Sequence, residues 1–286
     1  MTDSFKEKFR QAVAETEAVV YSYLPEETGH QKTIFEAMNY SVKAGGKRLR
    51  PLLMREVYRL FGGNGPEIGP FMAAMEMIHT SSLIHDDLPC MDNDEYRRGK
   101  LTTWKAYGYD MAVLAGDALM IYAFEVASKA FTMGADPAKG GRAIGILAEK
   151  TGIYGMIGGQ TVDVELTGKA VPREKLDFIY RLKTGALLEA SMMIGAVLAG
   201  ASDEEIREVE TMASEVGLAF QIQDDILDVT STQEELGKPV LSDEKNQKTT
   251  YVTLEGLEKA KQDVKEISDR AAGRLAGLPG KNEFLY

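Results

Sequence analysis

Apolar residues recur with the helical period of 3.6 along almost all of the 286 residues. In residues 3–23, for example, Phe5, Phe9, Val13 and Val20 are spaced to fall on one face of a helix. The period-two alternation that is typical of half-buried strands is almost absent. The pattern predicts an all-α fold. We expect helices over residues 3–23, 31–44, 49–61, 67–88, 108–133, 137–158, 172–200, 202–229 and 250–276.

The breaks between these helices are short and contain no linker rich in Pro, Ser or Gly. We therefore expect residues 1–286 to form a single domain, a bundle of about ten helices around a central cavity. With 44% hydrophobic and 27% charged residues, the composition is that of a soluble globular protein. The net charge of −11 and the pI near 5.0 argue against nucleic-acid binding.

The sequence also bears on the cellular compartment. Cys90 is the only cysteine, so an internal disulfide and a cysteine metal site are excluded. Residues 1–6 are polar and lack the apolar core of a signal peptide. The longest apolar run, 185–201, is short and carries Glu189, so we expect no stable membrane insertion. Together these features predict a cytoplasmic protein.

Two acidic clusters interrupt apolar helical stretches. In the first, Asp86 and Asp87 are followed by Pro89 and Asp92. Residues six apart do not share a helix face, but Pro89 removes a backbone donor and should open the helix after Asp87. The chain can then loop Asp92 back toward Asp86.

The second cluster lies within a predicted helix. At 100° per residue, Gln221, Asp224, Asp225 and Asp228 fall within an arc of about 100°. Two adjacent carboxylates ~4 Å apart repel by roughly 4 kcal/mol at an effective dielectric of ~20. Cations must offset this repulsion, and Mg²⁺ is the ion that bridges carboxylates to substrate phosphates. The two clusters, facing each other across a cavity, therefore predict a Mg²⁺-dependent enzyme that acts on a diphosphate.

The two motifs resemble the aspartate-rich motifs of the trans-isoprenyl diphosphate synthases, of the farnesyl and geranylgeranyl type. The first motif includes Arg97-Arg98-Gly99, and the resemblance extends in order from about residue 40 to about residue 255. The other matching segments are Gly45-Gly46-Lys47-Arg48-Leu49-Arg50-Pro51, Gly158-Gly159-Gln160 with Asp163, Lys183-Thr184-Gly185, Gly237-Lys238 and Lys248-Thr249-Thr250-Tyr251.

The resemblance implies roles for individual residues. The pocket for isopentenyl diphosphate, which binds without metal, is assigned to Lys47, Arg50, His79 and Arg98. The allylic diphosphate is assigned to Arg97, Lys183 and Lys238, completed by Thr184, Gln221 and, less securely matched, Lys248. Three Mg²⁺ ions are assigned to Asp86, Asp92 and Asp224, with waters ordered by Asp87, Asp225 and Asp228.

The reaction implied is a head-to-tail condensation. The allylic diphosphate ionises, the alkene of isopentenyl diphosphate attacks the cation, and a proton leaves to the released diphosphate. Lys183, Thr184 and Gln221 are placed to stabilise the cation by their dipoles. No nucleophilic side chain is needed, and Cys90 is interpreted as structural. A homodimer is the usual state in this family.

The length of the product depends on the helix before Asp86. In the family, an aromatic residue four or five positions before this aspartate stops elongation at farnesyl diphosphate. This chain has Ser81 and Ser82 there. Small side chains leave the groove open, which favours geranylgeranyl diphosphate over farnesyl diphosphate.

Three rivals are less consistent with these residues. A non-catalytic subunit typically lacks an aspartate motif or the basic loop, and both are intact here. A terpene cyclase would not need Lys47, Arg50 and His79 for a second diphosphate. A His-Asp phosphohydrolase needs more histidines than the three present. Residues 282–286 look like the start of a final helix, and the C-terminal helix is expected to be truncated.

Overall fold

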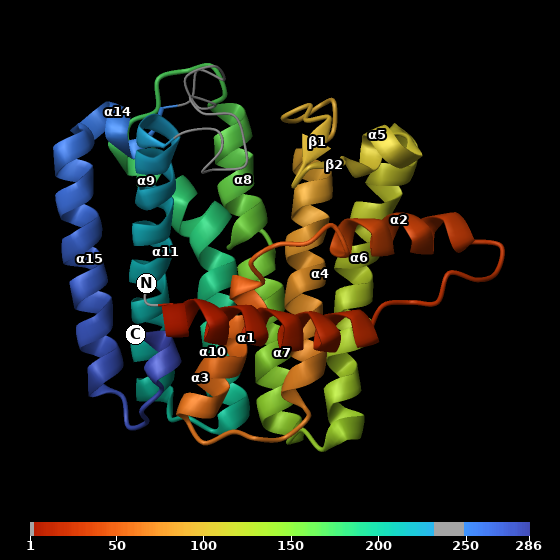
Figure 1. The fold of residues 1–286 in the computed structure, drawn as a ribbon, viewed down its shortest axis with the longest axis horizontal. Coiled ribbons are helices and arrows are strands. Elements are labelled where there is room, and N and C mark those ends of the chain that lie inside the picture. The colour runs from red at the N-terminus through yellow and green to blue at the C-terminus, as the bar shows by residue number, and fades with distance from the viewer. Residues whose placement is uncertain (1–2, 232–248) are drawn as a thin grey trace.

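The computed structural model describes residues 3–231 and 249–286 (Figure 1). Lys238 and Lys248, both expected near the allylic diphosphate, lie outside these residues. The predicted all-α class is confirmed, with a single two-stranded hairpin in the described parts of the chain.

The described helices and strands follow one another along the chain with these bounds: α1 (Asp3–Ser22), α2 (Lys32–Val42), α3 (Leu49–Leu60), α4 (Ile68–Asp86), β1 (Tyr96–Arg97), β2 (Lys100–Leu101), α5 (Thr103–Tyr107), α6 (Tyr109–Ser128), the 3₁₀-helix η1 (Lys129–Met133), α7 (Pro137–Thr151), α8 (Met156–Glu165), α9 (Arg173–Ile179), the π-helix η2 (Tyr180–Gly185), α10 (Ala186–Ala199), α11 (Asp203–Thr230), α14 (Tyr251–Glu255), α15 (Leu257–Gly277) and the 3₁₀-helix η3 (Glu283–Leu285).

The long helices α4, α6, α7, α10, α11 and α15 stand side by side, and α1 and α2 cross in front of them (Figure 1). Helices α4 and α10 form the centre, because both are apolar around most of their circumference. Phe71, Met75 and Ile78 of α4 and Ile194 of α10 are fully buried. Helices α4 and α11 both end at the upper end of the bundle in this view, which brings their acidic C-terminal turns to one end of the molecule.

Two predicted helices are interrupted. The helix expected over 137–158 breaks between Gly152, which is extended, and Gly155, whose backbone angles are not helical either. The helix expected over 250–276 breaks at Gly256, whose φ of 83° is left-handed. Glycine adopts these angles with little strain. Each break lets the chain change direction, and the first one turns α8 toward the ends of α4 and η2.

The helix predicted over 172–200 is continuous but widens into a π-helix at Tyr180–Gly185. This turn carries Lys183 and Thr184. Single π turns are uncommon and occur mostly at functional sites, because the wider turn alters the direction of neighbouring side chains and carbonyl groups.

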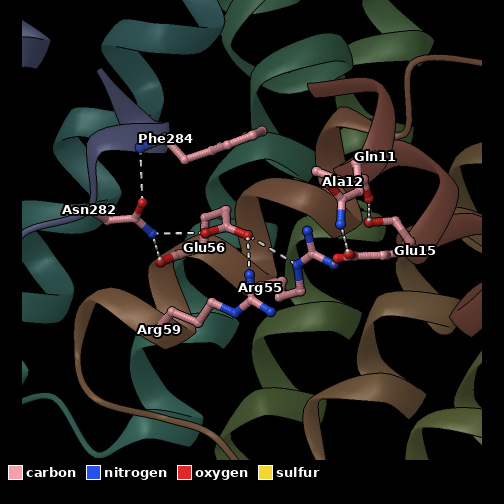
Figure 2. A network of polar contacts seen from close by, with 9 residues as sticks. Gln11, Ala12, Glu15, Arg55, Glu56, Arg59, Asn282 and Phe284 are labelled. Atoms are coloured by element: carbon pink, nitrogen blue, oxygen red, sulfur yellow. Dashed lines mark hydrogen bonds and ion pairs between the residues drawn. The ribbon is translucent and has the colours of Figure 1, made fainter. Parts of the chain in front are cut away.

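The C-terminal segment is pinned to α3 (Figure 2). Asn282 Nδ2 donates to the main-chain oxygen of Glu56 at 3.0 Å and to its side chain at 2.9 Å. Glu56 is buried and also accepts from Arg55 and Arg59. A buried carboxylate needs such partners to offset its lost hydration. Residues 283–285 form a 3₁₀ turn, and no α-helix begins there.

Within residues 3–231 and 249–286, two stretches are long and apolar enough to cross a membrane by composition alone. Arg173–Ala199 is 83% buried inside the protein, which is typical of a core helix. Tyr109–Met133 is only 39% buried, and α6 within it exposes Leu114 and Ile121 to solvent. The second stretch therefore has an apolar face without a partner in the described part of the protomer.

Candidate active site

The first acidic segment folds back on itself. Asp86 is the last residue of α4, and the helix opens at the next residues as Pro89 requires. The backbone N–H of Asp92 donates to the carbonyl oxygen of Asp86 at 2.9 Å, and Asn93 takes a left-handed φ of 55°. The loop thus brings Asp92 back beside Asp86, although the two residues are six apart.

The second acidic segment lies on the last turns of α11. Gln221, Asp224 and Asp225 line a cavity of about 220 Å³. Asp225 is only 3% exposed and accepts from Tyr180 Oη at 2.5 Å and from the backbone N–H of Tyr251 at 2.8 Å. Asp225 therefore also ties η2 and α14 to α11. Tyr180 and Tyr251 are partners that the sequence pattern did not single out for a role in the site.

The two segments line adjoining cavities. A larger cavity of about 750 Å³ is lined by Asp86 and is joined to the smaller one by Lys183 and Thr184, which line both. Burial lowers the pKa of Lys183, but the carboxylates of Asp163, Asp86 and Asp92 outweigh burial and raise the pKa overall. Lys183 is therefore a fully charged cation held between Asp163 of α8 and the carboxylates of the first segment.

Thr184 and Gln221 lie on the same side of this junction. Thr184 Oγ1 donates to Gln221 Oε1 at 2.9 Å, and Gln221 Nε2 contacts Asp225 Oδ1 at 3.4 Å. The hydrogen bond fixes the direction of the Gln221 amide, since its oxygen accepts from Thr184 and its nitrogen faces a carboxylate. The three residues predicted to act together, Lys183, Thr184 and Gln221, are thus brought together.

Asp87 points away from this hollow. It is 3% exposed and receives two-pronged hydrogen bonds from Arg97 at 2.6–2.9 Å. Burial raises the pKa of Asp87 to about 6, against the opposing effect of Arg97. The guanidinium of Arg97 is thus paired with Asp87 and lines neither of the cavities that Asp86 and Asp224 line.

A basic region of the larger cavity lies beside α4. Arg50 Nη1 is 3.3 Å from His79 Nε2, and both side chains line the larger cavity. Burial, and then the positive charges of Arg50 and Arg98, hold the pKa of His79 well below its ordinary value, so the imidazole is neutral. Burial lowers the pKa of Arg50 to about 10, which leaves it charged at neutral pH. Its buried Nε has no hydrogen-bond partner in the described part of the protein.

The other basic residues of this region differ in burial. Arg98 is exposed and donates to the carbonyl oxygen of Gly45, which draws the hairpin and the glycine loop together. Lys47 is exposed in that loop. Arg48 is 2% exposed and bound to Glu76 at 2.6 Å and Glu17 at 3.0 Å, so it is a structural residue. An unpaired donor at Arg50 and exposed cations around it form a site suited to an anion.

The two serines before Asp86 point in different directions. Ser82 lines the larger cavity. Ser81 is fully buried, donates to the carbonyl oxygen of Ile78 at 2.8 Å and does not line the cavity. Residue 82 therefore lies on the cavity side of α4, and residue 81, turned by 100°, lies on the side packed inside the protein. The expectation that both set its depth is corrected to Ser82.

Helix α8 contributes two polar side chains that were noted in the sequence without a role. Gln160 Nε2 donates to Asp86 Oδ1 at 2.7 Å, and Asp163 Oδ2 accepts from Lys183 Nζ at 2.6 Å. Gly159 permits this approach, because a Cβ there would lie 2.3 Å from the backbone nitrogen of Lys183. Their spacing of three residues places both side chains on one face of α8.

Replacing Gly159 with Ala should therefore destabilise the protein. The added methyl group meets backbone atoms that have little freedom to move, and overpacking of this kind costs roughly 1–3 kcal/mol. Gly145→Ala is the matched control, since no atom lies within 4 Å of its built Cβ. Thermal denaturation followed by circular dichroism should show a lower Tm for Gly159→Ala only. An unchanged Tm would mean that α8 shifts freely away from η2.

The arrangement can hold divalent ions and two anions. In the described residues, no group of three or more His, Cys, Asp or Glu side chains is close enough to bind a metal alone. An ion between Asp86, Asp92 and Asp224 would thus need water or ligand oxygens to complete its coordination, which is how Mg²⁺ usually binds. A second anion fits the pocket of Arg50, and the rest of the larger cavity is walled by apolar side chains such as Met91, Met120, Met156, Ile157 and Leu187.

Comparison with known proteins agrees with this geometry. The chain is 48% identical over 249 residues to the chloroplastic geranylgeranyl pyrophosphate synthase of Capsicum annuum, covering 87% of this chain and 67% of that protein. It is 44% identical over 261 residues to the farnesyl diphosphate synthase of Geobacillus stearothermophilus, covering 91% and 86%. A crystal structure of the geranyltransferase from Helicobacter pylori, complexed with magnesium and isoprenyl diphosphate, superposes with a TM-score of 0.85 at 32% identity over 100% and 95% of the two chains.

The sequence profile of the polyprenyl synthetase family matches residues 31–277, which is most of the chain. The acidic turns of α4 and α11 and the pocket of Arg50 lie within this range. The chain belongs to the polyprenyl synthetase family.

Proposed function

We propose that the protein is a Mg²⁺-dependent trans-prenyltransferase that condenses isopentenyl diphosphate with allylic diphosphates. Its main product is proposed to be all-trans geranylgeranyl diphosphate. The observation that best supports this function is the pair of adjoining cavities: Asp86 of α4 lines the larger one together with Arg50 and His79, and Asp224 of α11 lines the smaller one. The carboxylates are suited to metal ions and a diphosphate, and the pair of Arg50 and His79 to a diphosphate alone.

The carboxylates fit magnesium. Asp86, Asp92 and Asp224 offer hard oxygen ligands, and the loop that returns Asp92 to Asp86 places two of them together. We propose three ions per site, with the diphosphate and water as further ligands. Bound Mg²⁺ would neutralise the charge that develops on the leaving diphosphate. The Helicobacter pylori relative crystallised with magnesium and isoprenyl diphosphate supports this assignment.

The side chains of this chain have distinct tasks. Lys183 supplies a fixed positive charge beside the allylic diphosphate, since three carboxylates keep it protonated. The Gln221 oxygen, oriented by Thr184, presents a negative dipole to the allylic carbon as positive charge builds there. Arg50 binds isopentenyl diphosphate, and neutral His79 can accept a hydrogen bond from Arg50 or donate one to phosphate.

The apolar side chains of the larger cavity are proposed to shield the cation from water. Met91, Met120, Met156 and Leu187 come from the loop after α4, α6, α8 and α10, so four separate parts of the chain contribute apolar surface to it. A reactive allylic cation would otherwise be captured as an alcohol. The proton released after condensation is proposed to leave with the diphosphate.

Substituting Ser82 with Phe should shorten the product. A phenyl ring at this position would project into the cavity beside Asp86 and obstruct the growing prenyl tail. Chromatography of the dephosphorylated products should show a shift from geranylgeraniol to farnesol or geraniol. Ser82→Ala, which adds no bulk, should leave the product unchanged. If Ser82→Phe still forms geranylgeranyl diphosphate as the wild type does, the tail does not pass Ser82.

A homodimer is also proposed, with the exposed face of α6 and the turn before α8 at its interface. Ile121 and Leu114 on α6 are 73% and 55% exposed, and Tyr154 is 75% exposed. Such an apolar patch is unusual for a surface that faces water. A second copy of the chain accounts for it, because the same patch on both subunits can close a two-fold interface.

Ile121→Asp should break this dimer. A charge buried at an interface without a partner costs roughly 2–5 kcal/mol, which weakens association by about 30-fold to several thousand-fold. Sedimentation velocity should show a dimer for the wild type and a monomer for Ile121→Asp. Leu254→Asp, at an exposed position of α14, is the control and should stay dimeric. A wild-type monomer that binds lipid vesicles through α6 would contradict the proposed interface.

The activity is tested directly. The protein is incubated with Mg²⁺, labelled isopentenyl diphosphate and either dimethylallyl, geranyl or farnesyl diphosphate, with and without a chelator. Geranylgeranyl diphosphate should form, and only in the presence of metal. Farnesyl diphosphate as the end product would favour the alternative synthase, which the Geobacillus relative represents. No incorporation with any starter would contradict the proposed function and favour a non-catalytic subunit.

A further inference from the structure

Helix α8 contacts the first acidic segment through Gln160. The amide nitrogen of Gln160 donates to Asp86 Oδ1 at 2.7 Å across the larger cavity. A carboxylate can only accept, so the orientation of the amide is determined by Asp86. This hydrogen bond engages one of the two carboxylate oxygens. It thereby fixes the plane of the carboxylate group and the direction in which the other oxygen points.

The position of Gln160 is itself held from two sides. One turn further along α8, Asp163 binds Lys183 of η2 at 2.6 Å. Next to Gln160, the missing side chain of Gly159 lets α8 lie directly against the backbone of Lys183. Helix α8 is therefore fixed to the π-helix, and Gln160 transmits this fixed position to the end of α4.

The other end of the Gln160 amide has no protein partner. Its Oε1 atom is buried and lacks a hydrogen bond in the described part of the protein. A buried acceptor without a partner destabilises a fold, and a side chain kept in that position has a reason other than stability. The hydrogen bond to Asp86 supplies such a reason.

We propose that Gln160 is a positioning residue for the metal site. It orients Asp86 so that the carboxylate is ready to bind a divalent ion before the substrate arrives. Partners that orient a metal ligand commonly change metal affinity or activity by 10- to 100-fold when they are removed. The inference rests on the proposed use of Mg²⁺, and it concerns how this chain prepares its own carboxylate.

The test replaces Gln160 with Met, which has a similar length but cannot donate a hydrogen bond. Binding of Mn²⁺ to the protein without substrates is followed by electron paramagnetic resonance. The affinity should fall by roughly 10- to 100-fold. The Mg²⁺ concentration for half-maximal activity should rise by a similar factor. The KM for isopentenyl diphosphate should not change, because that substrate is assigned to the pocket of Arg50.

Gln262→Met is the matched control. Gln262 also donates to a carboxylate, Glu266 at 2.8 Å, but on the exposed surface of α15. Its variant should bind Mn²⁺ as the wild type does. Equal Mn²⁺ affinity of the wild type and Gln160→Met would overturn the inference. So would a rise in both the metal requirement and the KM for isopentenyl diphosphate, together with a lower Tm, since that would indicate a purely structural role.

The two proposals fail separately. Weaker Mn²⁺ binding by Gln160→Met, in a protein that forms no prenyl product, would support the role of Gln160 and contradict the proposed function. Full prenyltransferase activity together with unaltered Mn²⁺ binding by Gln160→Met would support the proposed function and contradict the role of Gln160.

Discussion

Asp86→Asn should lose at least roughly 10³-fold in kcat, because an amide is a poor ligand for a divalent ion and charge stabilisation by metals is worth several kcal/mol. Asp86 is the residue where the contacts of the site converge. It accepts from Gln160, its carbonyl oxygen receives the N–H of Asp92, and its charge acts on Lys183. The Asn side chain has almost the same shape, so the fold should be kept.

Incorporation of labelled isopentenyl diphosphate at saturating Mg²⁺ measures this loss. Asp269→Asn removes the same charge at an exposed position of α15 and should retain wild-type activity. Circular dichroism spectra of both variants should match that of the wild type. If Asp86→Asn keeps kcat within tenfold of the wild type, the first acidic segment does not hold the catalytic metal.

Arg50→Gln should raise the KM for isopentenyl diphosphate by roughly 10²-fold or more. Hydrogen bonds to charged groups contribute about 1.5–3 kcal/mol each, and a guanidinium can make two of them to one phosphate. Arg50 is suited to this role because its buried Nε lacks a partner and its pKa, lowered by burial to about 10, keeps it charged at neutral pH. The KM for the allylic substrate should change little.

Steady-state kinetics with each substrate varied in turn separates the two effects. Arg50→Lys should be intermediate, since lysine keeps the charge but loses the planar fork. Arg207→Gln, on the exposed surface of α11, is the control for loss of a positive charge. If the KM for the allylic substrate changes more than the KM for isopentenyl diphosphate, Arg50 binds the allylic diphosphate and the two proposed assignments are reversed.

Much of the fold could be predicted from local pattern. Helices α3 and α11 begin and end within one residue of the predicted ranges, because each has an apolar stripe of the correct period. The return of Asp92 toward Asp86 followed from a single residue, Pro89, which ends α4. These features depend only on residues that are close together along the chain, so they can be predicted from the sequence.

The wrong predictions have a common cause. The break at Gly152–Gly155 and the π-helix at Tyr180–Gly185 are stabilised by packing of α8 against η2. Glycine permits such a break without requiring it. Likewise, Ser81 and Ser82 are equivalent in sequence, and only the packing of α4 against its neighbours decides that Ser82 faces the cavity.

By itself, the sequence determined the helical class and the types of side chain available for chemistry, because helical period and charge are local properties. It also placed the carboxylates and the cations on particular helices and loops. Only the tertiary structure decided their partners: Arg97 binds Asp87, Asp163 binds Lys183, and Gln160 binds Asp86. A long polar side chain can reach several carboxylates, and the one that it binds is selected by distances between helices that no local pattern contains.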